Sequence, residues 1–269
     1  MTDPIGSIIM AAGRGSRMKG FQGSKTLLPL APMNSPFQGN QPILLHILGS
    51  LPAGPKALIV SHEKESIMEA TRYLDLAYLE QPVLNGTGGA LLAARPFLES
   101  APCQNFIITM GDVPLVRPET YLELVHALSS NVFVVLGFRP RNKRQYGALA
   151  IREQRVKRIV EWKYWHMWPQ EEQALLDLFN SGIYAARREA LLKSIPRLAS
   201  RPHTVVKERN GNQTKVEEFF ITDLVEIMEK DRCPVGFAVA RDEEEVMGVD
   251  DLESLLKAQE AYKRRTVEH

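Results

Sequence analysis

The chain has 269 residues, of which 44% are hydrophobic and 24% are charged, and this balance excludes a disordered or fibrous protein. Its 33 basic and 32 acidic residues leave a formal net charge of +1, so no global field favours nucleic acid or an anionic membrane surface. Cys103 and Cys233 lie far apart without metal-site spacing, which indicates a reducing compartment. The apolar stretch Ile5–Ala12 is too short to span a bilayer and lacks the basic flank of a signal peptide. We therefore expect a cytoplasmic protein with neither nucleic-acid nor membrane partners.

In the first half of the chain, short apolar runs alternate with segments of helical periodicity. The expected strands are Ser7–Ala12, Ala57–Ser61, Ala77–Gln81 and Phe106–Met110. One helix is expected to begin at Pro42, and others span Glu63–Tyr73 and Thr87–Leu98. Strands that alternate with helices are typical of a parallel sheet covered on both faces.

After about residue 130, strand-like runs follow one another with few helices between them. This pattern predicts a mixed, partly antiparallel region suited to a second substrate. The polar segment Ser200–Glu217 is interpreted as a long loop or insertion, and a final helix is expected at Asp250–Arg264. The strand-like runs are Val132–Arg139, Gly147–Arg152, Val156–Glu161 and Ser181–Ala186.

The strongest local signal is the glycine-containing segment that follows the first strand. It runs from Ala11 and Ala12 through Gly13, Gly15 and Arg17 towards Lys25. Glycines let backbone N–H groups approach phosphate oxygens, and the two cations can neutralise phosphate charge. The segment does not match the dinucleotide-binding fingerprint, which needs a glycine where this chain has Met18. It does not match the Walker motif either, which needs Gly-Lys-Ser/Thr where this chain has Gly23-Ser24-Lys25. We predict a phosphate-binding loop; the alternative is a strand-to-helix turn with surface cations.

Carboxylates follow a strand and precede a helix at two distant places. Asp112 comes after the strand Phe106–Met110, where ligands bind in open α/β sheets, and Asp250 and Asp251 precede the last helix. A Mg²⁺ ion that bridges substrate phosphates needs only one or two carboxylates. We predict that Asp112 and Asp250 form such a pair; helix capping is the alternative for each.

Other segments offer groups that suit a base and a sugar. Gln81 precedes the glycine-rich stretch Asn85–Gly89, where a flat base can lie against the backbone, although a plain turn would look similar. Gly147, Glu161 and Asn180 offer partners for sugar hydroxyls; the alternative is that Glu161 and Lys163 are outward residues on an edge strand. Core or interface packing is the first interpretation of a nearby aromatic cluster, and a lid over a sugar is the alternative. That cluster is Trp162, Tyr164, Trp165, His166 and Trp168.

The order and spacing of these segments resemble the sugar-phosphate nucleotidyltransferases, and most closely the uridyltransferase domain of the bifunctional N-acetylglucosamine-1-phosphate uridyltransferases. The resemblance covers nearly the whole chain. It implies an α/β fold of the nucleotide-diphospho-sugar transferase type, with a Rossmann-like, mixed but mainly parallel sheet and helices on both faces. It also implies one domain over residues 1–269, with a nucleotide-binding half up to about residue 130 and a sugar-binding half over residues 131–269.

The resemblance also assigns roles to individual positions. Arg17 and Lys25 become the catalytic cations, and Asp112 and Asp250 become the Mg²⁺ ligands. The implied reaction joins the nucleotidyl group of UTP to N-acetylglucosamine 1-phosphate and releases pyrophosphate. The implied nucleotide contacts are Ala11, Ala12, Gly13, Gly15, Gln81, Gly86 and Thr87, and the implied sugar contacts are Gly147, Glu161, Asn180, Phe220 and Thr222.

Several positions depart from the family pattern. Asp250 replaces an asparagine, Leu84 replaces a glutamine near the base, Phe220 replaces a tyrosine, and Trp162 with its aromatic neighbours replaces smaller polar residues. Two further hypotheses therefore stay open: a transferase for another base or sugar, and a non-catalytic nucleotide-sugar sensor. Nucleic-acid binding through residues 139–144 is disfavoured by the neutral charge. Because the family's left-handed helix is missing, neither acetyltransferase activity nor a trimer built on that helix is expected.

Overall fold

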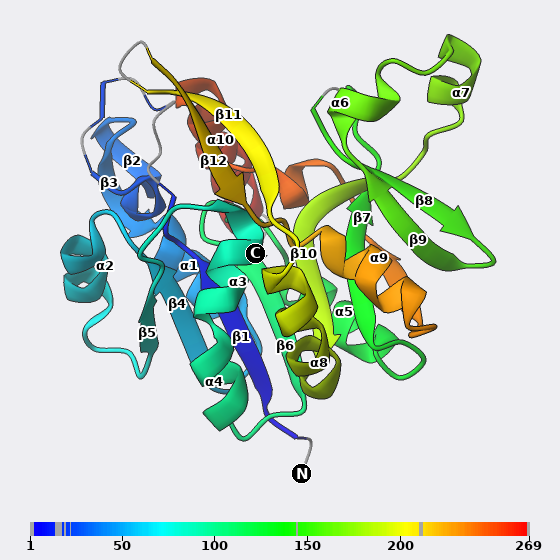
Figure 1. Cartoon of the computed structure of the whole chain (residues 1–269). Coiled ribbons are helices and arrows are strands. Elements are labelled where there is room, and N and C mark those ends of the chain that lie inside the picture. Colours follow the sequence, from blue (N-terminus) through cyan, green and yellow to red (C-terminus); the bar gives the residue numbers. More distant parts are fainter. Residues whose placement is uncertain are drawn as a thin grey trace.

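The computed structural model describes residues 3–13, 18, 20–21, 23–143, 145–209 and 212–267. Within these residues the largest sheet has nine strands, and seven of them follow one another in the order β13-β7-β10-β6-β1-β4-β5 (Figure 1). All four strands predicted in the first half belong to this path. The seven are β1 (Ile5–Met10), β4 (Lys56–Val60), β5 (Ala77–Glu80), β6 (Asn105–Met110), β7 (Phe133–Phe138), β10 (Phe179–Arg187) and β13 (Val235–Val239).

The sheet is mixed but mainly parallel, as predicted. β1 pairs in parallel with β4 and β6, β4 with β5, and β7 with β13. Among the seven strands of this path, β10 is the one that runs against the others, through antiparallel pairing with β6 and β7. β8 (Ala148–Arg152) and β9 (Arg155–Val160) join antiparallel beside β10. The expected change to partly antiparallel pairing after residue 130 is therefore confirmed.

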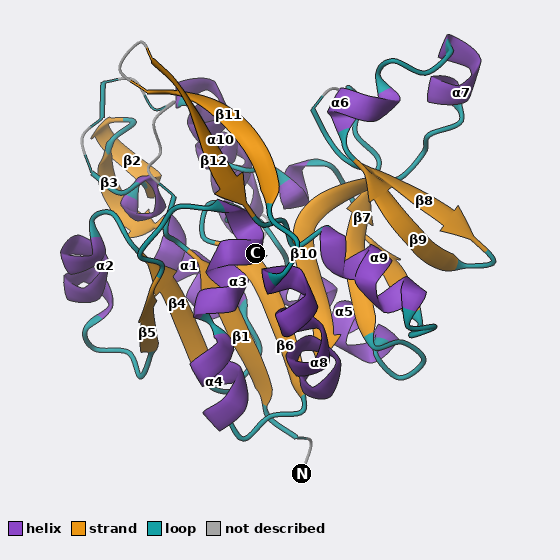
Figure 2. Ribbon diagram, viewed as in Figure 1, coloured by secondary structure: helices purple, strands orange, loops and turns teal. Residues whose placement is uncertain are grey.

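Helices cover both faces of the sheet, because neighbouring residues on its central strands point to opposite sides. Ile9 and Ile107 contribute to one hydrophobic cluster, whereas Ile8 and Ile108 contribute to the other. Figure 2 shows the helices on either side of the strands. The first cluster includes residues of α1 (Ile43–Ser50), α2 (Lys64–Thr71), α5 (Pro118–Ala127) and α10 (Leu252–Val267), and the second includes residues of α3 (Gly86–Ala93), α4 (Arg95–Ser100), α8 (Arg188–Ala199) and α9 (Asp223–Lys230).

Two predictions from the sequence were wrong. The single helix expected at Thr87–Leu98 is two helices, α3 and α4, and Pro96 lies in the first turn of the second. Proline has no N–H to continue the earlier helix, but it is well suited to begin a new one. The loop expected at Ser200–Glu217 is instead an antiparallel hairpin, β11 (His203–Arg209) and β12 (Asn212–Glu218). The polar composition gave no apolar alternation from which strands could be predicted. The two strands pair through backbone hydrogen bonds and need no buried apolar face.

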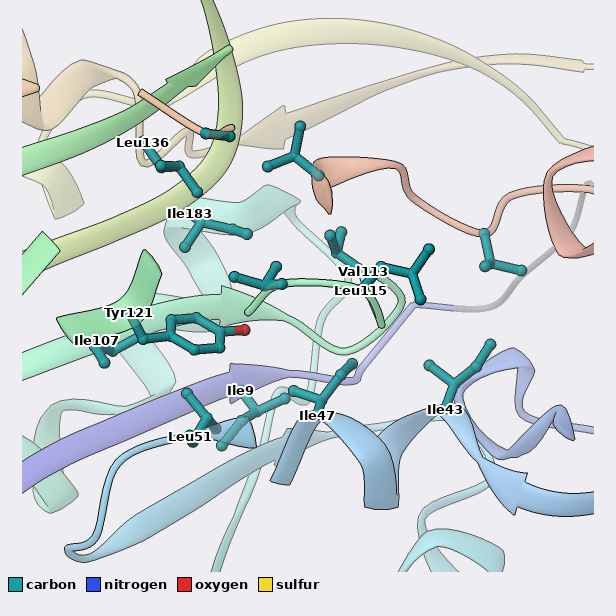
Figure 3. Packing of buried hydrophobic residues seen from close by; sticks show 14 of the residues in the cluster. Ile9, Ile43, Ile47, Leu51, Ile107, Val113, Leu115, Tyr121, Leu136 and Ile183 are labelled. Atoms are coloured by element: carbon teal, nitrogen blue, oxygen red, sulfur yellow. The ribbon is translucent and has the colours of Figure 1, made fainter. Parts of the chain in front are cut away.

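The core reaches the loops at the carboxyl ends of the central strands. Val113 and Leu115, which follow β6, are 4% and 2% exposed and point into the same cluster as Ile9 and Ile47 (Figure 3). These anchors fix the backbone next to Asp112. No helix in the described ranges is long and apolar enough to cross a membrane. The short elements are η1 (Lys25–Leu27), β2 (Pro29–Ser35), β3 (Gln38–Pro42), α6 (Trp162–Trp165), α7 (Gln170–Ala174) and η2 (Glu244–Val246).

Candidate functional site

Three charged residues from distant parts of the chain meet above the ends of β1 and β6. The Nζ atom of Lys25, at the start of η1, contacts Asp112 Oδ2 and lies 3.0 Å from Asp250 Oδ1. The Lys25 side chain is 11% exposed, and those of Asp112 and Asp250 are 23% and 39% exposed. The two carboxylates that the sequence proposed as a pair therefore converge on one cation.

Backbone hydrogen bonds hold these residues in place. Gly111 N–H donates to the carbonyl of Met10 over 2.9 Å, which joins the segment after β6 to the end of β1. A side chain at Gly111 would meet Met10 O at 3.0 Å, so glycine permits this close approach. Val249 N–H then donates to the carbonyl of Asp112 over 2.8 Å, and this bond places Asp250 beside the other carboxylate.

The adjacent aspartates before α10 have different roles. Asp251 Oδ1 accepts the backbone N–H of Ser254 at 2.9 Å, which is the geometry of a helix N-cap. The Ser254 hydroxyl oxygen in turn accepts the backbone N–H of Asp250 and of Asp251. Capping, the alternative considered for both residues, is thus carried by Asp251, and the side chain of Asp250 turns towards Lys25.

Two carboxylates face one ammonium group in this cluster. Burial alone would lower the pKa of Lys25, but the carboxylates of Asp112 and Asp250 outweigh that effect and raise it above its usual value. Within the described residues, no three His, Cys, Asp or Glu side chains gather as a metal site. Two carboxylates facing one cation position nevertheless fit a hard divalent ion that takes its other ligands from substrate phosphates and water.

A second group of predicted residues forms a compact loop after β5. Gln81, which is 4% exposed, donates from Nε2 to Asn85 Oδ1 over 3.0 Å and to Gly86 O over 3.1 Å. Gly86 has a φ of +91°, and a side chain there would lie 2.4 Å from Phe219 O. Two backbone hydrogen bonds of 2.8 Å hold the loop against Phe219. Gly88 N–H donates to Phe219 O, and Phe219 N–H donates to Asn85 O.

The same segment continues into the third group of predicted residues. Ile221 N–H donates to the Thr87 hydroxyl oxygen over 3.2 Å, and one residue later the Thr222 hydroxyl donates to Glu161 Oε1 over 3.2 Å. Residues 219–222 therefore join the predicted base loop to the predicted sugar contacts. Burial raises the pKa of the Glu161 carboxyl, against smaller lowering effects of the Thr222 hydroxyl and the Lys163 ammonium.

Gly147 and Asn180 complete this third group. Asn180 N–H donates to Gly147 O over 2.8 Å, and a side chain on Gly147 would lie 3.5 Å from Glu161 Oε2. The Asn180 amide donates to the Tyr184 hydroxyl over 3.0 Å. Glu161 is thus a half-buried residue facing other polar groups, and not the outward edge-strand residue that was the alternative interpretation.

Glu161 and Thr222 line an open cavity of about 770 Å³. Its wall includes Trp162 and Tyr164, which are 37% and 52% exposed, whereas Trp165 is buried at 3%. The aromatic run is therefore divided between core packing and a cavity wall. Further lining comes from Lys163, Arg201, His203, Phe220, Asp223 and Glu226.

Some residues of the predicted phosphate loop are placed and others are not. Ala11 and Ala12 are 2% and 4% exposed, and Ala11 N–H donates to Ile59 O over 2.9 Å. Among the described residues, its chain neighbours aside, no atom lies within 4 Å of a side chain built on Gly13. Gly15 and Arg17 lie outside the described residues.

The sequence assigned no role of their own to two residues of this site, Asn85 and Phe219. Asn85 hydrogen-bonds Gln81, yet an asparagine before a helix looks like an ordinary cap. Phe219 holds the base loop through its backbone alone, so its side chain gives no signal of that contact.

A mainly parallel sheet with a cation and paired carboxylates at its strand ends defines an α/β nucleotide-binding protein. Residues 7–202 match the model of the MobA-like NTP transferase domain, and the chain belongs to this family of nucleotidyltransferases. It is 30% identical over 266 residues to the bifunctional protein GlmU of Cereibacter sphaeroides, an alignment that covers 97% of the chain and 53% of GlmU. It is 29% identical over 262 residues to GlmU of Campylobacter lari, covering 95% and 53%. The chain spans about half the length of these curated relatives.

Solved structures confirm the fold. A nucleotidyl transferase from Methanothermobacter thermautotrophicus superposes with a TM-score of 0.61 at 18% identity, over 97% of this chain and 99% of that one. A candidate glucose-1-phosphate thymidylyltransferase from Bacillus anthracis gives 0.66 at 18% identity, over 96% and 95%. The predicted resemblance to the sugar nucleotidyltransferases, and to part of the bifunctional GlmU proteins, is confirmed.

Proposed function

We propose that this protein transfers a uridylyl group from UTP to a sugar 1-phosphate, with N-acetylglucosamine 1-phosphate as the first candidate, and releases pyrophosphate. The observation that carries this proposal is the convergence of Lys25, Asp112 and Asp250 at the strand ends. Membership of the nucleotidyltransferase family supports a triphosphate and a sugar phosphate as the two substrates.

In the proposed reaction, a phosphate oxygen of the sugar phosphate attacks the α-phosphorus of the triphosphate in line. The bond from that phosphorus to the bridging oxygen breaks, and pyrophosphate leaves with the electron pair. No covalent intermediate with the protein is needed, because positioning and charge neutralisation carry such transfers. Lys25, together with Arg17, would stabilise the charge on the leaving group.

Asp112 and Asp250 are the proposed ligands of Mg²⁺, which when bound supplies charge neutralisation at the reacting phosphates. Lys25 holds the two carboxylates close together in the free protein. Asp250, where the family has asparagine, keeps an oxygen ligand and adds one negative charge. The Asp250 carboxylate contacts the Lys25 ammonium group, which neutralises part of the added charge in the free protein.

The hydrogen bonds of Gln81 support uracil as the base. Both amide hydrogens of Gln81 are used within the loop, on Asn85 Oδ1 and Gly86 O. The group that Gln81 can still offer a ligand is therefore its oxygen, an acceptor. Uracil carries a ring N–H that can donate to such an oxygen, whereas the corresponding nitrogen of cytosine is itself an acceptor.

The groups around Glu161 support a sugar on the opposite side of residues 219–222. A carboxylate, the Thr222 hydroxyl, the Asn180 amide and the backbone of Gly147 suit sugar hydroxyls and an N-acetyl group. Phe220 lies on the wall of the same cavity. We assign residues up to about 130 to the nucleotide half and residues 131–269 to the sugar half of one domain.

A different sugar is the second candidate, and the aromatic wall favours it. Trp162 lies on the cavity beside Glu161 and is partly exposed, so it is available to stack on a ring or substituent that N-acetylglucosamine lacks.

The test is pyrophosphate release with Mg²⁺ for five triphosphates, UTP, CTP, dTTP, ATP and GTP, each offered with N-acetylglucosamine 1-phosphate or glucose 1-phosphate. Release with UTP and N-acetylglucosamine 1-phosphate is the expected result. Release with UTP and the other sugar phosphate would keep the reaction and change the product. If nucleotide binds but no pair reacts, the transferase proposal fails for these sugars, and the hypothesis of a nucleotide-sugar sensor gains support.

A further inference from the structure

Asn85 occupies the N-cap position of α3 but does not cap the helix. Asparagine is among the best N-cap residues, and such a cap stabilises a helix by about 1 kcal/mol. Within the described residues, the Asn85 side chain makes no capping hydrogen bond. Its Oδ1 instead accepts the amide of Gln81 over 3.0 Å.

The surroundings of Asn85 are shaped for this contact. A side chain on Gly89 would lie 1.7 Å from Asn85 Oδ1 and 3.0 Å from Gln81 Nε2, so the glycine leaves the space that the two amides fill. The backbone of Asn85 is fixed independently, because its carbonyl accepts Phe219 N–H over 2.8 Å. Asn85 and Gly89 thus act as a matched pair around Gln81.

The consequence concerns which end of the Gln81 amide a ligand meets. Gly86 O can only accept a hydrogen bond, so the nitrogen of Gln81 must face it and the amide orientation is fixed. Asn85 takes the second amide hydrogen. In the described part of the chain no donor meets Gln81 Oε1, and this oxygen is not among the fully buried polar atoms without a partner. It is therefore the acceptor that the Gln81 amide still offers.

We propose that Asn85 is a positioning residue for base selection. It holds the second amide hydrogen of Gln81 away from the ligand, so that the base meets an acceptor only. This arrangement favours a base with a ring N–H, such as uracil, over cytosine, whose acceptor ring nitrogen would face the Gln81 oxygen. The inference rests on the proposed function in one respect, that the base lies at Gln81.

The test is equilibrium binding of UTP and CTP with Mg²⁺, measured by titration calorimetry on the full chain. The parent is expected to bind UTP on the order of 10- to 100-fold more tightly than CTP, because the cytosine of CTP cannot donate a ring N–H to the Gln81 oxygen and leaves it without a hydrogen bond. In Asn85→Ala the second amide hydrogen of Gln81 loses its acceptor and becomes available to a ligand, and the ratio of the two affinities is expected to fall about tenfold. Asn85→Asp keeps an oxygen acceptor and is expected to keep the ratio within about threefold of the parent.

A matched control separates this effect from general loosening. Asn131, which follows the end of α5, also makes a side-chain hydrogen bond at a helix end, to Ala127 O over 2.8 Å. Asn131→Ala is expected to leave the affinity ratio unchanged. Thermal unfolding of all variants checks that each is folded before its affinities are compared.

The outcomes separate this inference from the proposed function. An unchanged ratio in Asn85→Ala would overturn the inference while leaving the transferase intact. Equal affinities of the parent for UTP and CTP would overturn both the uracil assignment and the role of Asn85. If the ratio moves as expected but no sugar phosphate reacts, the inference holds and the proposed reaction fails.

Discussion

The proposed nucleotide side and the proposed sugar side of the candidate site are built in different ways. On the proposed nucleotide side, backbone hydrogen bonds join the strand ends and the base loop, and the Lys25 side chain is 11% exposed between two carboxylates. On the sugar side, contacts run mainly between side chains, as in Glu161 with Thr222, and the wall includes partly exposed aromatic rings. Side-chain contacts can change without moving a sheet. We infer that the sheet fixes the positions of the proposed catalytic residues, whereas the proposed sugar contacts are more open to substitution.

The largest expected effect tests the nucleotide side. Lys25→Met keeps most of the side-chain stem and removes the charge between Asp112 and Asp250, so turnover is expected to fall on the order of 10²–10³. Initial rates of pyrophosphate release measure this. The control is Lys157→Met. It removes the ion pair between Lys157 on β9 and Glu229 on α9, which does not include a residue of the Lys25 cluster. A Lys25 variant within about threefold of the parent would remove the assigned role.

The adjacent aspartates sharpen the comparison, because one is assigned to chemistry and the other to stability. Asp250→Ala removes a carboxylate from the Lys25 cluster and is expected to lower turnover at least tenfold. Asp251→Ala removes the N-cap of α10 and is expected to lower the free energy of unfolding by about 1 kcal/mol. Its turnover below the unfolding transition should stay near the parent value.

Rates and chemical denaturation of both variants give the readout. If Asp251→Ala lost as much turnover as Asp250→Ala, the division of roles between these neighbours would be wrong.

A smaller effect is expected on the sugar side. Trp162→Ala removes part of the cavity wall beside Glu161, so KM for the sugar phosphate is expected to rise several-fold. KM for the triphosphate should stay within about twofold, because the base loop does not include this side chain. Steady-state kinetics with each substrate varied in turn would show this split. An equal rise in both KM values would mean that the two sides are not separable.

How much the sequence could predict differs between the same two regions. Buried strands such as Phe106–Met110 are uniform apolar runs, so the mainly parallel sheet was predictable. The hairpin at residues 203–218 was not, since neither of its strands shows the apolar alternation of a buried face. Lys25 and Asp250 are 225 residues apart, and only the family resemblance could place them together. The link between Phe219 and the base loop uses backbone atoms, which leave no mark on the sequence.

The smallest expected effect concerns the stability of the sugar side and its dependence on pH. Burial raises the pKa of Glu161 above its ordinary value of 4.5. A carboxyl group whose pKa is higher in the folded than in the unfolded state contributes stability below its unfolded pKa, and this contribution is lost as the pH rises through the folded pKa. At neutral pH the charged Glu161 therefore costs stability, and Glu161→Gln is expected to raise Tm by a few degrees while it weakens binding of the sugar phosphate.

The gain in Tm should shrink as the pH falls towards 4.5, where the parent carboxyl is itself protonated. Thermal unfolding of both proteins between pH 4 and pH 8 measures the difference, with Glu171→Gln on the exposed surface of α7 as the control. A Tm difference that did not change with pH would show that the charged form of Glu161 does not lower the stability of the folded protein, and the assigned effect of its burial would be wrong.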